Sequence, residues 1–202
     1  MLPNSIRELI RNLQALPGVG PKSARRMALH MLERNRPGAQ RLAASIGDAM
    51  ERVKRCEQCR NWSETPVCGI CASEKRLSNV LCVVETPSEV MAIEQTGVYR
   101  GRYFVLHGLL SPIDGVGPDA LGLSQLVSYV GEHAIDEVLL ALSSTMEGEV
   151  TTQYITDALK YQVRVSRLAH GIPVGGELDY LDPDTLAVAI NGRRAMIAGT
   201  EE

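Results

Sequence analysis

Apolar side chains recur every three to four residues through the first quarter of the chain, a spacing typical of helices that pack on one face. The first such face consists of Ile6, Leu9, Ile10, Leu13 and Leu16. Ser5 and Glu8 stand at the spacing of a capping box, so we expect the helix to begin there. Pro17 is expected to end it, because proline cannot continue a helix.

A second and a third helix follow at the same spacing. Pro21 predicts the start of the second, because proline fits the first turn of a helix. Its buried side is predicted to hold Ala24, Met27, Ala28, Met31 and Leu32. The third is predicted over residues 39–54, with an apolar face of Leu42, Ala43, Ile46, Ala49, Met50 and Val53.

From residue 80 onward, short apolar runs alternate with helical stretches. Strands are predicted at residues 80–84, 103–106, 138–142 and 163–165. One helix is predicted after Ser88 and through residue 93. Others are predicted over residues 123–130, 151–160 and 185–191. This alternation predicts an α/β fold with parallel strands and crossover helices. The glycine-rich loop Gly171–Gly176 is expected either to shape an interface or only to join a strand to a helix.

Charge divides the chain into two unlike parts. The 202 residues carry a net charge of −3, but residues 1–79 hold fourteen Lys and Arg against seven Asp and Glu. Residues 80–202 hold seven Lys and Arg against seventeen Asp and Glu. A basic first part favours a polyanionic partner, although both surfaces could simply be solvated. No long apolar run or secretory pattern occurs, so we expect a cytoplasmic protein with no membrane segment.

Four of the five cysteines stand as two Cys-x-x-Cys pairs, Cys56 with Cys59 and Cys68 with Cys71. Each pair suits a tight turn that aims both sulfurs at one ion, and four thiolates make a closed tetrahedral zinc site. The metal is expected to supply folding energy on the order of 10 kcal/mol, because the segment has almost nothing to bury apart from Trp62, Val67 and Ile70. Disulfides or a redox pair are the alternatives. The fifth cysteine, Cys82, is predicted to lie buried in a strand.

The turn between the first two predicted helices has the composition of a phosphate-binding hairpin. Gly18 and Gly20 let the backbone approach a ligand, and the N–H groups at the start of the next helix point out at its positive end. Lys22, Arg25 and Arg26 add charge beside them. We therefore expect sequence-independent, salt-sensitive binding to DNA phosphates. The alternative is an ordinary hairpin for packing or dimerisation. The stretch LPGVGPKSARRMA resembles a helix-hairpin-helix motif.

Three glutamates follow predicted strands at their carboxyl ends, where parallel sheets place their sites. Glu85 follows the first predicted strand, and Glu147 and Glu149 follow the third. This arrangement resembles the Toprim domain of type IA topoisomerases and primases, in which acidic groups hold magnesium. Ser143 and Thr145 stand where that pattern has aspartates. Magnesium needs converging carboxylates, so we do not expect it to bind, and the glutamates are as readily structural or partner-facing.

The order of these parts is specific along the whole chain. The pieces are LPGVGPKSARRMA, the four cysteines, VVETPSEV, AIEQTG, GLLSPIDGVGP, STMEGE and RLAHGIPVGGELDYLD. Together they closely resemble the RecR family of bacterial recombination mediators. The resemblance implies a helix-hairpin-helix region at residues 1–55, a four-cysteine zinc finger at 56–71, a Toprim domain at 80–175 and a C-terminal helical tail at 176–202. Ser143-Ser144 and His107 are small departures from the family pattern.

The resemblance also implies a function. It implies a ring-like homotetrameric DNA clamp that works with RecO and RecF proteins in recombinational repair and has no catalytic turnover. The hairpin cations would hold phosphates, and Glu85, Glu147 and Glu149 would contact a basic partner protein. Two other functions stay open: a magnesium-dependent Toprim nuclease or topoisomerase-like enzyme that uses those glutamates, and a zinc-dependent adaptor that touches only proteins.

Overall fold

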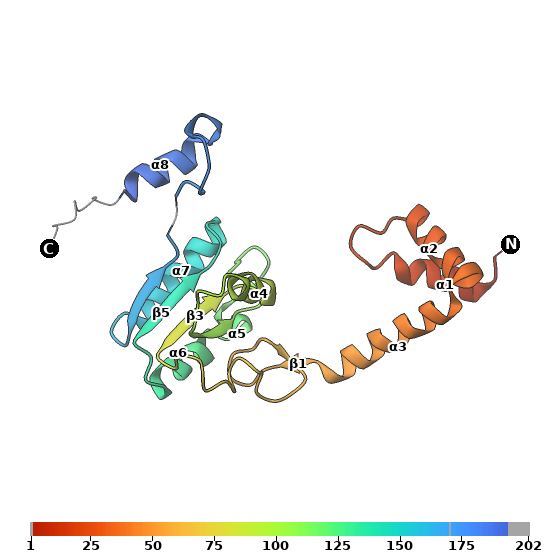
Figure 1. The fold of residues 1–202 in the computed structure, drawn as a ribbon, viewed down its shortest axis with the longest axis horizontal. Coiled ribbons are helices and arrows are strands. Elements are labelled where there is room, and N and C mark those ends of the chain that lie inside the picture. The colour runs from red at the N-terminus through yellow and green to blue at the C-terminus, as the bar shows by residue number, and fades with distance from the viewer. Residues whose placement is uncertain (1, 170, 194–202) are drawn as a thin grey trace. The chain divides into compact units, whose positions relative to one another are not determined.

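The structure, a computed structural model, describes residues 2–169 and 171–193. The chain separates into a helical unit, Met1–Lys54, and a sheet unit, Arg55–Glu202 (Figure 1). His170 and residues 194–202 of the predicted loop and tail lie outside the described residues. The boundaries predicted inside the sheet unit, at residues 56–71, 80–175 and 176–202, stay predictions.

The helical unit consists of α1 (Asn4–Leu13), α2 (Pro21–Arg34) and α3 (Arg36–Arg52). Pro21 occupies the first turn of α2, as predicted, and Gly20 is its N-cap residue. Ala24 and Ala28 of α2 are completely buried. These small side chains let neighbouring helices come close. The predicted pair of helices joined by a turn is confirmed.

The start and the end of α1 differ from the prediction. The helix begins at Asn4, after Pro3, and no side chain caps it, so the capping box of Ser5 and Glu8 was wrong. Ser5 already lies inside the first turn, where its hydroxyl cannot act as the cap. The helix ends at Leu13, one turn early, because the next three residues donate their N–H groups to carbonyls three positions back. Leu16 therefore lies in a tight turn and is 54% exposed.

Several predicted core positions of the helical unit are open to solvent. Met27 is exposed rather than buried. The helix α3 begins at Arg36, three residues before the prediction, because the Asn35 side chain accepts a hydrogen bond from the Gly38 N–H at 3.1 Å. On the predicted apolar face of α3, exposed fractions are 49% for Leu42, 54% for Ile46 and 77% for Met50. Amphipathic spacing thus identified the helix correctly but overstated its burial.

The sheet unit contains a four-stranded parallel sheet. Its strands are β3 (Val80–Val84), β4 (Arg102–Val105), β5 (Glu137–Ala141) and β6 (Arg164–Arg167), in the order β4-β3-β5-β6. Cys82 in β3 pairs with Tyr103 of β4 on one side and Leu139 of β5 on the other. Cys82 is completely buried, as predicted. The α/β prediction with parallel strands is confirmed.

Helices cover both faces of this sheet. They are α4 (Pro87–Gln95), α5 (Pro118–Leu121), α6 (Leu123–Glu132) and α7 (Met146–Leu159). Alternate residues of each strand face opposite sides, so Leu81 and Val83 pack with the helices α5, α6 and α7. Cys82 and Val84 pack on the other face with Val90 of α4. Each face therefore has its own apolar cluster.

The helix α7 begins five residues before its prediction. Its N-cap residue is Thr145, whose hydroxyl accepts a hydrogen bond from the Gly148 N–H at 3.2 Å. A Cβ atom at Gly148 would lie 1.9 Å from the Ser143 carbonyl oxygen, so only glycine fits this turn. Glu147 and Glu149 consequently lie in the first helical turn rather than in a loop.

A small two-stranded sheet and a helical tail complete the description. The strands β1 (Lys54–Arg55) and β2 (Trp62–Ser63) pair at the cysteine segment. The tail contains the 3₁₀ helix η1 (Leu178–Tyr180) and α8 (Pro183–Asn191), which Asp182 caps. Across the described residues, we find no helix with the length and apolar character needed to span a membrane.

Candidate metal centre and nucleic-acid interface

The four predicted ligands Cys56, Cys59, Cys68 and Cys71 come together in the sheet unit. Their Sγ atoms all lie within 4.8 Å of one another, and each side chain is at most 5% exposed. The Cys59 and Cys68 Sγ atoms are 3.5 Å apart. A tetrahedron with zinc–sulfur bonds of about 2.3 Å has sulfur–sulfur edges of roughly 3.8 Å. The cluster therefore fits a closed zinc site, and no disulfide links its cysteines.

Backbone hydrogen bonds shape the first of the two turns. The Cys56 N–H donates to the Asn61 carbonyl at 2.7 Å, and the Arg60 N–H donates to the Cys56 carbonyl at 2.9 Å. Arg60 has a left-handed backbone with φ of 64°, which closes the turn just after the second ligand. The Cys68 N–H donates to the Cys56 Sγ at 3.2 Å, so the two turns are joined even without the ion. Such N–H contacts favour the thiolate form that a metal binds.

Hydrogen bonds within the cluster favour one thiolate, that of Cys68, and raise the pKa values of Cys59 and Cys71. The pKa of Cys68 lies below its usual range because the thiols of Cys59 and Cys71 donate hydrogen bonds to its sulfur. The hydrogen bond to Cys68 raises the pKa of Cys59 to about 12, and burial adds to this shift. Zinc would hold all four sulfurs as thiolates and would release the protons that these pKa values describe.

Arg60 fastens the cysteine segment to the helices of the same unit. It is only 7% exposed, and its guanidinium donates to the carbonyls of Leu121 and, at 3.4 Å, Ala120. Its Cζ atom lies 5.7 Å from the centre of the Phe104 ring. Sequence reasoning missed this residue, because its partners lie about sixty positions away and no local pattern points to them.

The segment also contacts the edge of the sheet. The Val105 N–H of β4 donates to the Cys59 carbonyl at 2.9 Å. The His107 Nε2–H donates to the Arg60 carbonyl at 2.7 Å, and burial lowers the pKa of His107, so the ring is held as a neutral donor. The cysteine cluster and the end of β4 thus position each other.

The hairpin turn of the helical unit has the backbone geometry that close approach to a ligand requires. Gly18 has φ of 75°, a left-handed conformation that favours glycine. A Cβ atom at Gly18 or Gly20 would meet no atom within 4 Å, so the space beside the turn is open. The first intrahelical bond of α2 runs from the Ala24 N–H to the Gly20 carbonyl, and the N–H groups of Lys22 and Ser23 precede it.

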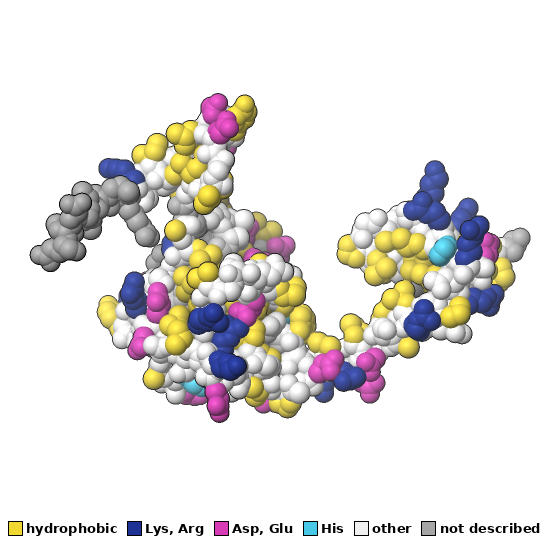
Figure 2. All heavy atoms as spheres, viewed as in Figure 1, with side chains coloured by type: hydrophobic (Ala, Val, Ile, Leu, Met, Phe, Trp, Pro, Cys, Tyr) yellow, Lys and Arg dark blue, Asp and Glu magenta, His cyan; other side chains and the backbone are white. Residues whose placement is uncertain are grey.

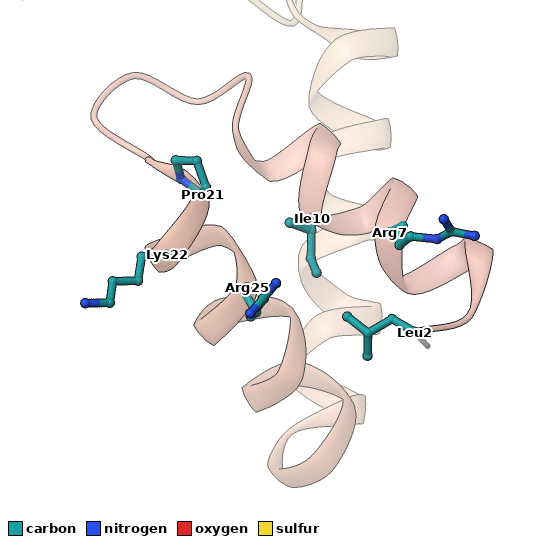
Figure 3. A pocket seen from close by; sticks show the side chains of 6 residues that line it. All are labelled: Leu2, Arg7, Ile10, Pro21, Lys22 and Arg25. Atoms are coloured by element: carbon teal, nitrogen blue, oxygen red, sulfur yellow. The ribbon is translucent and has the colours of Figure 1, made fainter.

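Cationic residues of α1 and α2 are among those that line a cavity of about 620 Å³ beside this turn (Figure 3). Its lining consists of Leu2, Arg7, Ile10, Pro21, Lys22 and Arg25. Arg25 and Ile10 point toward each other, whereas Lys22 extends away from α1 (Figure 3). Arg26 is exposed but is not part of this lining. Arg7 was not among the predicted residues, because a single arginine on α1 carries no motif.

The helical unit presents its charge outward. Figure 2 shows Lys and Arg side chains gathered over its helices, with few Asp or Glu side chains among them. Lys22, Arg25 and Arg26 are all exposed. Positive side chains beside helix N–H groups form a suitable surface for phosphate.

Of the three predicted glutamates, Glu85 lies at the carboxyl end of β3 and is half-buried. Its backbone N–H donates to Glu89 Oε2 at 2.7 Å, and Glu89 also forms a capping box with Thr86 at the start of α4. Burial, and then the charge of Glu89, raise the pKa of Glu85. The role of Glu89 was missed, although the spacing from Thr86 to Glu89 is the capping-box spacing.

Glu147 and Glu149 occupy the first turn of α7, where carboxylates interact favourably with the helix dipole. Glu149 forms a two-point ion pair with Arg167 of β6, at 2.6 and 3.2 Å. Within residues 2–169 and 171–193, the cysteines form a group of candidate ligands at metal-binding distance, and the three glutamates do not. They therefore do not converge as a magnesium site would require.

Matches to known families lie along most of the chain, between residues 6 and 194. The RecR helix-hairpin-helix family matches residues 6–50, and the four-cysteine zinc finger domain of RecR matches residues 53–73. The Toprim domain matches residues 79–169, and the RecR C-terminal family matches residues 171–194. Each match coincides with one of the structural parts described above.

Two curated proteins are similar to the chain over almost all of its length. The recombination protein RecR of Saccharophagus degradans is 53% identical over 190 residues, which cover 94% of this chain and 96% of that protein. The recombination protein RecR of Hydrogenovibrio crunogenus is 51% identical over 192 residues, which cover 95% and 98%. The similarity includes the zinc finger and the hairpin together, not a single shared domain.

Proposed function

The chain belongs to the RecR family of recombination proteins, and on this premise we propose that it is a non-catalytic DNA clamp. It has a role in recombinational repair, and we propose that it acts there with RecO and RecF proteins in the cytoplasm. Its zinc finger is structural, because four buried thiolates leave no ligand position for a substrate.

The start of α2 carries the DNA-binding part of this proposal. An open glycine turn, N–H groups at a helix start, and Lys22 and Arg25 at one cavity offer both kinds of phosphate contact. Arg26 extends the charge along α2. Because none of these groups needs a base edge, binding is expected to be independent of sequence and to weaken steeply with salt.

Charge reversal at the hairpin tests the proposal. The double variant Lys22→Glu, Arg25→Glu should weaken binding to a labelled oligonucleotide roughly tenfold or more at low salt. The slope of the logarithm of the binding constant against the logarithm of salt concentration should become less steep by about one for each residue changed. The matched control is Arg34→Glu, Arg41→Glu, which makes the same charge change at exposed sites of the same unit. Equal loss in both variants, or no loss in the first, would count against the hairpin.

The clamp requires more than one copy, and the helical unit has a surface suited to self-association. A groove of about 310 Å³ between its helices is lined by Leu9, Leu13, Met31, Leu42 and Ile46 among others. Its apolar character supports burial against a second copy of the chain. Ile46→Asp should lower the mass in solution and reduce DNA affinity, because linked copies bind one DNA molecule by multivalency. An unchanged mass would contradict this part of the proposal.

We assign contacts with RecO or RecF to the acidic sheet unit. Glu147 is exposed, whereas Glu85 is half-buried and the carboxylate of Glu149 pairs with Arg167. Glu147→Lys should weaken RecO binding in a titration, whereas Glu132→Lys, at an exposed site on α6, should not. Equal effects of the two variants would indicate only a loss of net negative charge.

The absence of turnover is tested directly against the enzyme alternative. Supercoiled and single-stranded DNA would be incubated with the zinc-loaded protein and magnesium. We expect no cleavage, because Glu85, Glu147 and Glu149 do not converge on one ion. Cleavage that disappears in Glu85→Gln would replace the clamp with a Toprim enzyme.

A further inference from the structure

The surface of the zinc segment carries a tryptophan that its own unit does not bury. Trp62 in β2 is 52% exposed, and it is the only tryptophan of the chain. Sequence reasoning counted this side chain among the few that the segment could bury, so its exposure is a correction. An indole ring that stays half open to water is a candidate for contact with a ligand that has an aromatic face.

Two flat side chains flank this ring. The Arg55 guanidinium lies over the indole, with its Cζ atom 5.9 Å from the ring centre. The His107 ring lies 5.1 Å from the indole, centre to centre, at an interplanar angle of 59°. Arginine planes and aromatic rings are the side chains on which unpaired bases stack.

The local backbone holds this group in place. His107 has a left-handed backbone with φ of 64°, and its Nε2–H donates to the Arg60 carbonyl. Arg55 lies in β1, the partner strand of β2, so the pairing sets it beside Trp62. The hydrogen bond of His107 and the β1–β2 pairing thus fix where the two neighbours of the indole lie.

We propose that Trp62, flanked by Arg55 and His107, is a stacking platform for an unpaired base of single-stranded DNA. This inference rests on the proposed DNA clamp and adds to it a preference for unpaired bases, which the hairpin contacts cannot provide. Phosphate contacts can form with single-stranded and with double-stranded DNA. Stacking on a side chain requires a base that is not paired with a partner strand.

The charge at the platform favours nucleic acid over a protein partner. Arg55 brings a full positive charge against the exposed ring, where it can both stack on a base and attract the adjoining phosphate. A patch that docks protein side chains would more often be an apolar cluster of several residues, and here the neighbours of Trp62 are a guanidinium and an imidazole.

The single tryptophan makes the platform directly observable in the wild-type protein. Stacking of a thymine on Trp62 should quench its fluorescence when zinc-loaded protein is titrated with an oligodeoxythymidylate. An abasic oligonucleotide of equal length, which keeps the phosphates, should leave the emission unchanged. A fully paired duplex should also leave it unchanged. Anisotropy of labelled strands reports binding itself in each titration.

Three variants sharpen the result. Trp62→Ala should weaken oligodeoxythymidylate binding roughly tenfold, within the range for loss of one stacked base, and should leave duplex binding unchanged. Trp62→Phe should keep most of the affinity. Tyr161→Ala is the matched control, because Tyr161 is 91% exposed with the Lys160 ammonium 5.1 Å from its ring centre, and it should have no effect.

The outcomes separate this inference from the function on which it rests. Binding of the oligodeoxythymidylate without quenching would overturn the platform and leave the DNA clamp intact. Absence of binding to single strands and duplex alike would overturn both. An emission change that follows protein concentration without DNA would place Trp62 between copies of the chain and would overturn the platform.

Discussion

The helical unit and the sheet unit differ in how much apolar surface each buries by itself. The sheet unit covers both faces of its sheet and adds a cysteine cluster. In residues 2–54, only Ala24 and Ala28 are buried, while Leu42, Ile46 and Met50 are largely exposed. The two units thus bury very different shares of their apolar side chains. We therefore expect the sheet unit to be stable as one copy and the helical unit to gain stability where its exposed apolar face is covered.

Loss of the zinc ligands should have the largest effect, and it should strike the sheet unit alone. Cys59→Ser is expected to lower the free energy of unfolding by at least about 4 kcal/mol, because structural zinc contributes on the order of 10 kcal/mol. Denaturant unfolding followed by Trp62 fluorescence, together with zinc content, measures this. Cys82→Ala, at a buried cysteine outside the cluster, should keep the zinc. An unchanged melting temperature after chelation would contradict a structural role.

Truncation of one leucine in each unit tests the comparison itself. Leu126→Ala, at a site 1% exposed, should cost about 2–5 kcal/mol at any protein concentration. Leu42→Ala, at a site 49% exposed, should cost little in dilute protein, below about 0.5 kcal/mol, and more where copies associate. Melting temperatures over a hundredfold range of concentration measure both. Equal costs at high dilution would mean that the helical unit is self-sufficient.

The next largest loss of stability is expected in the polar cluster of Arg76, Glu94 and Tyr103 in the sheet unit. The Arg76 guanidinium pairs with the Glu94 carboxylate, which also accepts from the Tyr103 hydroxyl at 2.6 Å. Glu94→Gln should cost about 1–2 kcal/mol at pH 7, since hydrogen bonds to charged groups are strong. Arg76 lowers the pKa of Glu94, so this stabilisation exists above the unfolded pKa and disappears as pH falls through the folded one. If the stability cost of Glu94→Gln grew toward acid pH, the stabilising role of the ionised Glu94 would be refuted.

Replacement of Glu85 should change stability least, and it should stabilise the protein rather than destabilise it. Burial raises its pKa, so folding favours the protonated form, and the ionised form is slightly destabilising at neutral pH. Glu85→Gln should therefore raise the melting temperature slightly at pH 7, and the difference should vanish once the pH is well below the unfolded pKa of about 4.3. A melting temperature lowered by this variant at pH 7 would imply that Glu85 holds a partner group.

Local patterns predicted much of this molecule. The zinc site follows from two pairs of cysteines, each within one turn, and the start of α2 follows from Pro21 because proline acts on its own residue and its neighbours. The strands β3 and β5 followed from short apolar runs. The α1 start was wrong because Ser5 and Glu8 had the correct spacing without the correct backbone position.

Contacts between distant residues could not be predicted in the same way. Arg60 and His107 are 47 positions apart. Each has a left-handed backbone, which the sequence does not indicate because neither residue is glycine. Glu149 looked like part of an acidic site, but it lies in α7 and pairs with Arg167 of β6. Exposure of Leu42 could not be foreseen either, because an amphipathic helix has the same spacing whether its partner lies in its own chain or in another.

The hydrogen bond between the Val105 N–H and the Cys59 carbonyl has a further consequence. The strand β4 is an edge of the parallel sheet, and its residues Tyr103, Phe104 and Val105 are apolar and buried. The zinc segment shields this edge from strands of other molecules, as edges of natural sheets generally must be shielded. Removal of zinc should accordingly expose this edge, and aggregation should accompany the loss of stability.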